Sequence, residues 1–329
     1  MPFVEVLDLH KYFPVQRGFL ENALSRKREF VRAVDGVEFT IEKGETFGLV
    51  GESGSGKTTT GRLLLRLIEP TSGQILIDGK DVVDMRSDEL LVFRRQAQMI
   101  FQDPAAALNP RMTIGQAIKD ALDIHKVGRS NSRKNAVLQI LERVGLTPPE
   151  LFYDKYPHQL SGGQRQRAVI GRAMILEPRL IVADEPVAMV DVSVRAQILD
   201  LLLSLKRDLE LTYVFVTHDL ATANYFCDRI GIMYLGRIVE VGPRDAVFSS
   251  PKHPYAVALM SAIPVPDPEY KKKRNIPRGE IPNPINPPSG CRFHPRCPKA
   301  FAPCATKEPS SVQVSPSHCV ACHLFDIER

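Results

Sequence analysis

A glycine-rich stretch at residues 51–58 is the feature that most limits how this chain can fold. It fits the pattern G-x-x-x-x-G-K-[ST], with the residues Gly51, Glu52, Ser53, Gly54, Ser55, Gly56, Lys57 and Thr58. The preceding Glu45–Val50 is typical of a short buried strand, and the following Thr59–Ile68 has the spacing of an amphipathic helix. This context predicts a loop whose N–H groups surround phosphate oxygens at a helix N-terminus.

A second helix start of the same type is predicted about 100 residues later. Ser161, Gly162, Gly163 and Gln164 directly precede a helical pattern at Arg165–Ile175. Small residues before a helix leave its first N–H groups accessible, and the helix dipole favours an anion there. One chain is therefore expected to carry two phosphate-binding helix starts.

Polar side chains follow three predicted buried strands. The run from Leu180 ends in Asp184 and Glu185, Gln102 follows Gln98–Phe101, and His218 follows Thr212–Thr217. Open α/β sheets build their sites at the C-terminal ends of strands, and carboxylates there suit Mg²⁺ binding and general-base work. Taken singly, Gln102 is typical of a surface residue, and a lone histidine is more often structural than catalytic.

An aromatic pair follows the first predicted strand, Val4–Leu9. Tyr12 and Phe13 could stack on a purine ring or simply pack against the sheet. The stretch Pro14–Phe30 is predicted to be an irregular loop, and Val31–Glu42 alternates apolar and polar residues like an antiparallel strand.

Further elements are predicted along the rest of the first 250 residues. They are a strand at Gln74–Asp78, a helix-rich stretch from 113 to 157 read as an inserted helical subdomain at about 105–160, a helix at Val194–Leu209 and a hairpin at 229–241 turning at Leu235-Gly236.

Composition excludes some classes of protein. The chain has 329 residues, 43% of them hydrophobic, which is ample for a packed core. It has no apolar run long enough to span a bilayer, and its charged N-terminus does not resemble a signal peptide. The net charge of +5 is mild and interleaved, which does not favour nucleic acid as a partner.

The composition and periodicity of the sequence change after residue 250. Residues 251–290 are proline-rich, carry a basic run at 271–274 and show almost no periodicity, so a linker is predicted there. The last part, 291–329, holds five of the six cysteines, namely Cys291, Cys297, Cys304, Cys319 and Cys322. Such a cluster is more typical of metal binding than of disulfides in a cytosolic protein.

The order of these motifs resembles the ATP-binding subunit of an ABC transporter. The narrower match is to the oligopeptide/dipeptide importer group, through Ile100–Arg111, Tyr156–Gln166, His253-Pro254-Tyr255 and the cysteine tail. The resemblance covers essentially the whole chain. It implies an α/β P-loop NTPase fold with a RecA-like core, an antiparallel β subdomain and an inserted helical subdomain, in a nucleotide-binding domain at 1–250, plus a small cysteine-rich extension.

The resemblance also assigns roles in an ATPase site. Phe13, or less favourably Tyr12, would stack on adenine, residues Gly51 to Thr59 would hold the phosphates, and Lys57 would contact them. Thr58, Gln102 and Asp184 would surround Mg²⁺, Glu185 would polarise the attacking water, and His218 would contact the γ-phosphate. Ser161, Gly162, Gly163 and Gln164 would serve the ATP of a partner domain. Asp191 is kept, but Ala188-Met189-Val190 replaces the usual Ser-Ala-Leu before it.

The tail implies a metal centre in some members of the group. Cys291, Cys297, Cys304 and Cys322 are similar to a [4Fe–4S] motif; Zn²⁺ and unligated thiols remain open, and Cys319 could replace Cys322. The implied partners are a similar but distinct ATPase subunit, two membrane permease subunits and an extracytoplasmic binding protein, without nucleic acid, at the cytoplasmic face of the membrane. The implied cargo is peptide, or a related solute such as nickel or an oligosaccharide. Competing hypotheses are an ABC ATPase that acts on nucleic acid or ribosomes, and a redox sensor that uses the cysteine tail.

Overall fold

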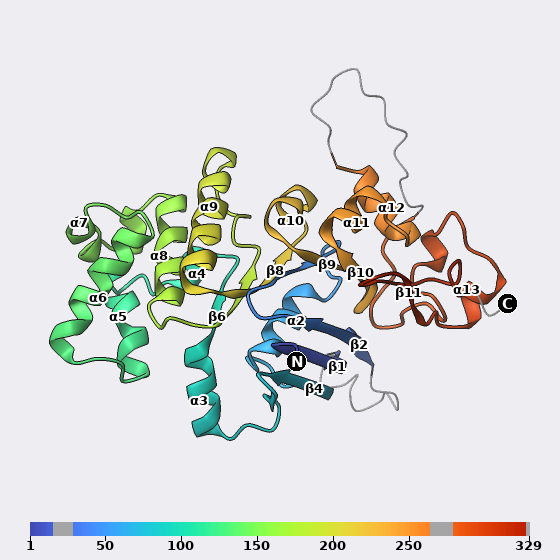
Figure 1. Cartoon of the computed structure of the whole chain (residues 1–329), viewed down its shortest axis with the longest axis horizontal. Coiled ribbons are helices and arrows are strands. Elements are labelled where there is room, and N and C mark those ends of the chain that lie inside the picture. The colour runs from blue at the N-terminus through green and yellow to red at the C-terminus, as the bar shows by residue number, and fades with distance from the viewer. Residues whose placement is uncertain (16–28, 264–278, 327–329) are drawn as a thin grey trace, which may run out of the picture. The chain divides into compact units, whose positions relative to one another are not determined.

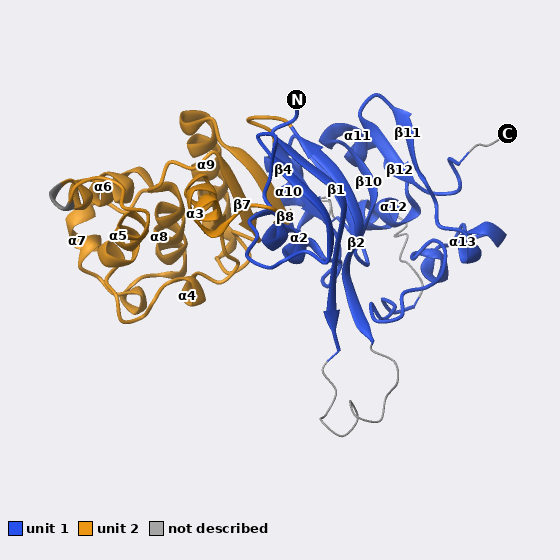
Figure 2. Ribbon diagram, turned by 90° about the horizontal axis from the view of Figure 1, so that it is seen from below, with its two compact units in different colours: residues 1–41, 46–83, 217–329 blue, residues 42–45, 84–216 orange. Residues whose placement is uncertain are grey.

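The computed structural model describes residues 1–15, 29–263 and 279–326. The chain forms two compact units, which Figure 2 shows in different colours. Unit 1 contains residues 1–41, 46–83 and 217–329, and unit 2 contains residues 42–45 and 84–216. The predicted C-terminal extension therefore clusters with the N-terminal strands and the phosphate loop.

Unit 1 begins with an antiparallel sheet in the order β2-β1-β4-β5. Its strands are β1 (Val4–Pro14), β2 (Phe30–Ile41), β4 (Ser72–Ile77) and β5 (Lys80–Asp81). Alternate residues are buried at 37–41 of β2, as period-two patterning predicts. The predicted strands at 31–42 and 74–78 are confirmed with small changes of boundary, and β1 continues five residues beyond the predicted 4–9. Most of the predicted loop, 16–28, lies outside the described residues.

The second sheet of unit 1 has the strand order β11-β12-β10-β9-β3. Its members are β3 (Thr46–Val50), β9 (Arg229–Tyr234), β10 (Arg237–Pro243), β11 (Ser311–Ser315) and β12 (His318–Ala321). All five residues of β3 are buried, and β3 pairs in parallel with β9. The predicted hairpin turn is confirmed, because Leu235 and Gly236 both have positive φ. The β11–β12 hairpin was not predicted, since its short strands lie among cysteines and prolines.

The helices of unit 1 are short. They are α2 (Lys57–Leu64), α10 (Leu220–Phe226), α11 (Arg244–Ser249), α12 (Pro254–Ser261) and α13 (Ala302–Thr306), with a 3₁₀ turn η2 (His294–Arg296). Figure 1 shows α11, α12 and α13 in the orange and red C-terminal part of the chain. Helix α2 begins two residues before the predicted start.

Helix α12 lies inside the interval 251–290 that the sequence predicts as a linker. Pro254 occupies its first turn, where a missing N–H costs nothing, and Tyr255, Ala256, Ala258 and Met260 are buried. The prolines around this apolar run obscured a packed helix, so the start of the interval is part of the unit 1 core and is not a linker.

Unit 2 contains three parallel strands in the order β8-β7-β6, with helices around them. The strands are β6 (Ala97–Ile100), β7 (Leu180–Asp184) and β8 (Thr212–Thr217), whose last residue begins the final segment of unit 1. Every residue of β7 and β8 is buried, as the continuous apolar runs predict.

The helices of unit 2 are α3 (Ser87–Gln96), α4 (Pro104–Ala107), α5 (Ile114–Ile124), α6 (Ser130–Arg143), α7 (Pro149–Tyr153), α8 (Gly162–Met174) and α9 (Val192–Leu209), with a 3₁₀ turn η1 (Pro157–Gln159). Helices α5 to α7 account for the helix-rich stretch predicted at 113–157, and α9 matches its prediction closely. Among the described residues, no helix is both long and apolar enough to cross a lipid bilayer.

Candidate active site

The phosphate loop lies between β3 and α2, as predicted. Gly56 has φ 105°, and a Cβ atom at this position would approach the carbonyl oxygen of Ala33 to 2.2 Å, so only glycine fits. Helix α2 begins at the next residue, Lys57, which places its first N–H groups at the loop. The Nζ atom of Lys57 donates to the carbonyl oxygens of Gly51 (2.8 Å) and Glu52 (2.9 Å). The loop thus brings backbone N–H groups and a buried ammonium group together, and these are the groups that bind phosphate in such loops.

The two aromatic residues of β1 have different surroundings. The hydroxyl of Tyr12 donates to the buried carboxylate of Asp35, and burial together with this bond raises the pKa of Tyr12 to about 12. Phe13 is exposed, and the ammonium of Lys11 lies 4.9 Å from the centre of its ring. The exposed ring of Phe13 is the one free to stack on a base, which supports the preference for Phe13.

The C-terminal end of β7 carries the two predicted carboxylates. Asp184 is 2% exposed, whereas Glu185 is partly exposed and has a left-handed backbone with φ 47°. A glutamate in this conformation is uncommon, and such residues cluster at functional sites. The Nε2 atom of Gln102 donates to Oε2 of Glu185 at 3.0 Å. Two residues 83 positions apart, both predicted from strand ends, therefore meet.

The signature segment forms the start of α8. Ser161 is the N-cap, and its hydroxyl accepts from the backbone N–H of Gln164 at 3.2 Å. The side chain of Gln164 accepts in return from the N–H of Ser161 at 3.0 Å, which completes a capping box. The predicted second helix start is confirmed, and the helix includes Gly162 and Gly163.

Asp191 and His218 also flank helices. Asp191 is the N-cap residue of α9 but makes no side-chain capping bond, and the neighbouring Met189 is exposed. His218 is exposed directly after β8, and the next residue, Asp219, caps α10. His218, Tyr12, Phe13 and the phosphate loop belong to unit 1; Gln102, Asp184, Glu185, the signature and Asp191 belong to unit 2.

The predicted metal site in the cysteine tail is not supported. Throughout residues 1–15, 29–263 and 279–326, no three His, Cys, Asp or Glu side chains are arranged to hold a metal ion. All five cysteines of the tail are in this part of the chain and are free thiols. The iron–sulfur cluster that the resemblance implied therefore has no support in the described part of the chain.

The thiols of the tail lie in partly buried surroundings. Burial, followed by the charges of Cys291, Cys297 and Cys304, raises the pKa of Cys322 to about 11. Burial also raises the pKa of Cys291 and Cys297. Cys319, the alternative ligand, is instead paired in β12 with Val241 of β10 and Gln313 of β11.

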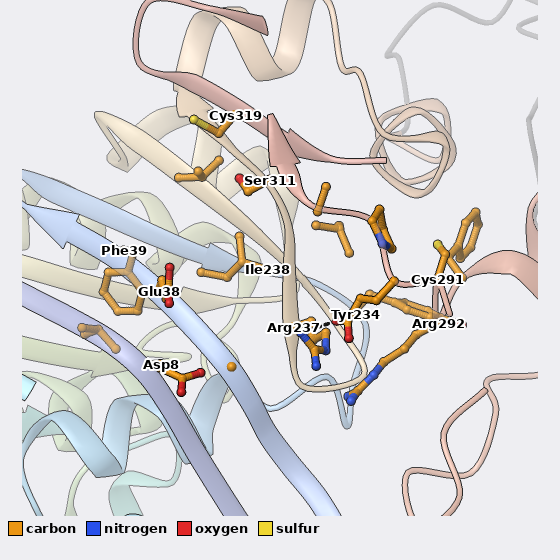
Figure 3. Close-up of a pocket in the computed structure, with 18 of the residues that line it drawn as sticks. Asp8, Glu38, Phe39, Tyr234, Arg237, Ile238, Cys291, Arg292, Ser311 and Cys319 are labelled. Atoms are coloured by element: carbon orange, nitrogen blue, oxygen red, sulfur yellow. Dashed lines mark ion pairs between the residues drawn. The ribbon is translucent and has the colours of Figure 1, made fainter. Parts of the chain in front are cut away.

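A pocket of about 590 Å³ lies between the antiparallel sheet and the C-terminal residues of unit 1. Figure 3 shows Asp8, Glu38 and Phe39 along the strands on one side, and Arg237, Tyr234 and Arg292 close together on another. No residue of the phosphate loop lines it. Two arginines that line the pocket form ion pairs: Arg237 pairs with Glu308, and Arg292 pairs with Asp35.

Sequence reasoning missed a contact to the phosphate loop. Arg296 forms an ion pair with Glu52, and the hydroxyl of Tyr255 accepts from the backbone N–H of Glu52. The only sequence signal was the segment His253-Pro254-Tyr255, which carried part of the family resemblance without a role.

Comparison with known proteins agrees with this geometry. The family model described as "ABC transporter" matches residues 34–188, and that described as "Oligopeptide/dipeptide transporter, C-terminal region" matches residues 239–304. The oligopeptide transport ATP-binding protein AppF of Bacillus subtilis is 45% identical over 98% of this chain and 97% of the relative. A putative peptide import ATP-binding protein of Brucella ovis is 51% identical over 98% of this chain and 97% of its own length.

Solved structures show the same fold. The dimeric ATP-binding cassette MJ0796, in a post-hydrolysis state bound to ADP and Pi, has a TM-score of 0.64 and 30% identity, covering 73% of this chain and 98% of that chain. CbiO1 from Clostridium perfringens, part of the transporter complex cbiONQ, has a TM-score of 0.63 and 26% identity, covering 76% and 91% of the two chains. The chain belongs to the ATP-binding proteins of ABC transporters, in the family defined by the oligopeptide/dipeptide transporter C-terminal region.

Proposed function

We propose that this chain hydrolyses ATP to drive peptide import through separate membrane subunits. The observation that carries the proposal is the pair formed by Gln102 and Glu185 at the end of β7, in a chain that also presents a formed phosphate loop. A carboxylate held by an amide at a strand end can accept a proton from an attacking water.

Phosphoryl transfer to water needs positioning and charge stabilisation more than covalent chemistry. Lys57 and the N–H groups of the phosphate loop would bind the β- and γ-phosphates, and His218 would contact the γ-phosphate. Glu185 would polarise the water, and its bond to Gln102 would orient the carboxylate. Phe13 would stack on the adenine.

The oxygen donors of Thr58, Gln102 and Asp184 fit Mg²⁺, because this ion prefers hard oxygen ligands. Asp184 lies at the C-terminal end of β7, the edge of a parallel sheet where such sites are built. When bound, Mg²⁺ would neutralise charge on the phosphates. No metal-binding cluster in the cysteine tail takes part in the proposal.

The signature at the start of α8 would act on the ATP of a second ATPase subunit, and Asp191 would lie in the same contact between subunits. The solved relative MJ0796 is described as a dimer bound to ADP and Pi, which supports this arrangement. Pairing with a similar but distinct ATPase, two permeases and an extracytoplasmic binding protein would place the chain at the cytoplasmic face of the membrane.

Peptide as cargo is supported by the relatives, which include an oligopeptide transport protein and putative peptide import proteins. The test is ATP hydrolysis by the purified transporter in vesicles, with its binding protein and a set of peptides. We expect hydrolysis to rise with peptide and peptide to accumulate inside. Co-purification with nucleic acid in place of permeases would overturn the proposed role in transport. ATP hydrolysis that does not rise with peptide but rises with nickel or an oligosaccharide would overturn peptide as the cargo.

A further inference from the structure

Two residues of the C-terminal part of the chain, Tyr255 and Arg296, contact Glu52 of the phosphate loop. The guanidinium of Arg296 donates to both oxygens of the Glu52 carboxylate, at 2.8 Å and 3.3 Å. The backbone N–H of the same residue donates to the hydroxyl of Tyr255 at 2.9 Å. The side chain of Arg296 is 8% exposed, so this two-point ion pair is mostly shielded from water.

Both partners of Glu52 are held in place by aromatic packing. The ring of Tyr255 is fully buried and lies 4.7 Å from the ring of Tyr234 and 5.4 Å from that of Phe293, centre to centre. The guanidinium of Arg296 lies 5.8 Å from the ring of Tyr234 and 6.0 Å from that of Phe293, at cation–π distance. These contacts leave Arg296 and Tyr255 little freedom to move away from the loop.

The peptide unit that bonds to Tyr255 also bonds to Lys57 of the loop. A trans peptide unit is planar, so its N–H and its C=O turn together. The peptide unit between Gly51 and Glu52 directs its N–H to Tyr255 and its C=O to the Nζ atom of Lys57, at 2.8 Å. The orientation that Tyr255 and Arg296 impose on this unit therefore also sets where the Lys57 ammonium is held.

A second arginine of the same segment reaches the other end of the predicted nucleotide site. Arg292, visible in Figure 3, forms an ion pair with Asp35 and donates to the carbonyl oxygen of Leu235. Asp35 in turn accepts from Tyr12, which neighbours Phe13. The segment Cys291–Cys297 thus touches the loop through Arg296 and the support of the aromatic pair through Arg292.

We propose that the segment Cys291–Cys297, together with Tyr255, sets the conformation of the phosphate loop, and that Arg296 is a positioning residue for nucleotide binding. The C-terminal extension then controls ATP affinity directly, through unit 1 alone. This inference rests on the proposed binding of ATP by the loop and goes beyond it, because it assigns a role to residues outside every nucleotide-binding motif.

The test is ATP binding and hydrolysis by the full-length chain and its complex. Arg296→Gln removes the charge and the two-point pair, so we expect the Kd for ATP to rise about tenfold, since hydrogen bonds to charged groups are the stronger ones. The KM should rise in parallel, with kcat at saturating ATP nearly unchanged. Arg296→Lys should restore part of the affinity because it keeps the charge. Tyr255→Phe, which removes only the hydroxyl, should weaken binding about threefold.

Glu308→Gln is the matched control. It removes another ion pair between the extension and the rest of unit 1, but that pair ends on Arg237 of β10. We expect Glu308→Gln to leave ATP affinity unchanged even if it lowers the melting temperature. In a Glu52→Gln background, Arg296→Gln should have no further effect on the Kd.

Three outcomes would overturn the inference. The first is a wild-type Kd for ATP in both Arg296→Gln and Tyr255→Phe, and the second is an equal loss of ATP affinity in Glu308→Gln. The third is an undiminished effect of Arg296→Gln on the Kd in the Glu52→Gln background. Tyr255→Phe keeps the test decisive if Arg296→Gln does not fold. A wild-type chain that binds no ATP would instead refute the proposed function on which the inference rests.

Discussion

The starts of α2 and α8 are two helix N-termini with the same expected ligand and different chemistry. Helix α2 begins after Gly56, which has no side chain, so its first N–H groups face a loop built for phosphate. Helix α8 begins after Ser161, whose hydroxyl already accepts from the N–H of Gln164 in a capping box. At α8 the capping box engages the N–H groups of Ser161 and Gln164, whereas α2 has no side-chain cap at Gly56.

We infer from this difference that the two helix starts contribute differently to nucleotide binding. The phosphate loop adds the Lys57 ammonium to its N–H groups, and charge-assisted bonds are about twice as strong as neutral ones. The signature would offer neutral donors, namely backbone N–H groups and the hydroxyl of Ser161, and each such bond is weaker than one to a charged group. We therefore expect α2 to supply affinity for ATP and α8 to report the arrival of a partner's ATP.

The largest effect should come from Glu185→Gln, which leaves both helix starts intact. We expect turnover to fall by roughly 10²–10⁴, the span of a lost general base, with ATP binding preserved. A single-turnover assay on the purified complex measures this. The variant should also retain ATP between the two helix starts for longer. Hydrolysis close to the wild-type rate would exclude Glu185 as the base.

Lys57→Ala tests the contribution of the phosphate loop at the start of α2. Removing the ammonium should weaken ATP binding by roughly 100-fold, because a bond to a charged group is lost at the phosphates. Equilibrium titration of the full-length chain with ATP measures the change. Lys43→Ala is a suitable control, since Lys43 is an exposed cation that precedes β3 and pairs with the exposed Glu210. An undiminished affinity would show that the loop does not depend on its lysine.

Ser161→Ala tests the contribution of the signature at the start of α8. Monomeric ATP affinity should stay at the wild-type value, whereas ATP hydrolysis by the complex should fall roughly tenfold for the loss of one hydrogen bond to the partner's phosphate. The variant should also lose about 1 kcal/mol of stability, because Ser161 caps the helix. Thr113→Ala removes a similar capping box at α5 and controls for stability alone. Equal loss of hydrolysis in both variants would contradict a specific role for the signature.

Asp35→Asn tests how much the charge network around this buried carboxylate stabilises unit 1. Burial alone would raise the pKa of Asp35, but the Tyr12 hydrogen bond and the charge of Arg292 outweigh it and lower the pKa to about 2. A carboxyl with a depressed folded pKa stabilises the protein above its unfolded pKa and loses that contribution as the pH falls towards 2. Denaturant melts should show a wild-type advantage of about 2 kcal/mol at neutral pH. The advantage should fade between about pH 4 and pH 2, and one that did not change with pH would contradict this reasoning.

The last prediction concerns the thiols and is not expected to change ATP binding or hydrolysis. Because the pKa of Cys322 is raised to about 11, its thiolate fraction at neutral pH should be about 100-fold below that of an ordinary thiol, and alkylation should be slow. Mass spectrometry of partly alkylated native protein measures this, with Cys319 as the more accessible reference. A chelator should not change the rates. A chelator that exposed Cys291, Cys297, Cys304 and Cys322 together would restore the metal hypothesis.

Much of the nucleotide-binding machinery was predictable because it depends on local order along the chain. The loop at 51–58, the helix start at Ser161 and the carboxylates after β7 each follow from a short pattern with a fixed backbone consequence. The hairpin at Leu235-Gly236 was predictable for the same reason. Helix α12 was not, because prolines on both sides masked a buried face.

The amino-acid sequence by itself determined the family, the phosphate loop and the residues at the strand ends, since these rest on spacing between neighbours. Only the tertiary structure decided that the cysteines form no metal-binding arrangement, that Tyr12 is engaged with Asp35, and that Arg296 meets Glu52 across 244 residues. Such contacts depend on where distant segments pack, and side-chain burial and charge pairing there are properties of the folded core that no local pattern encodes.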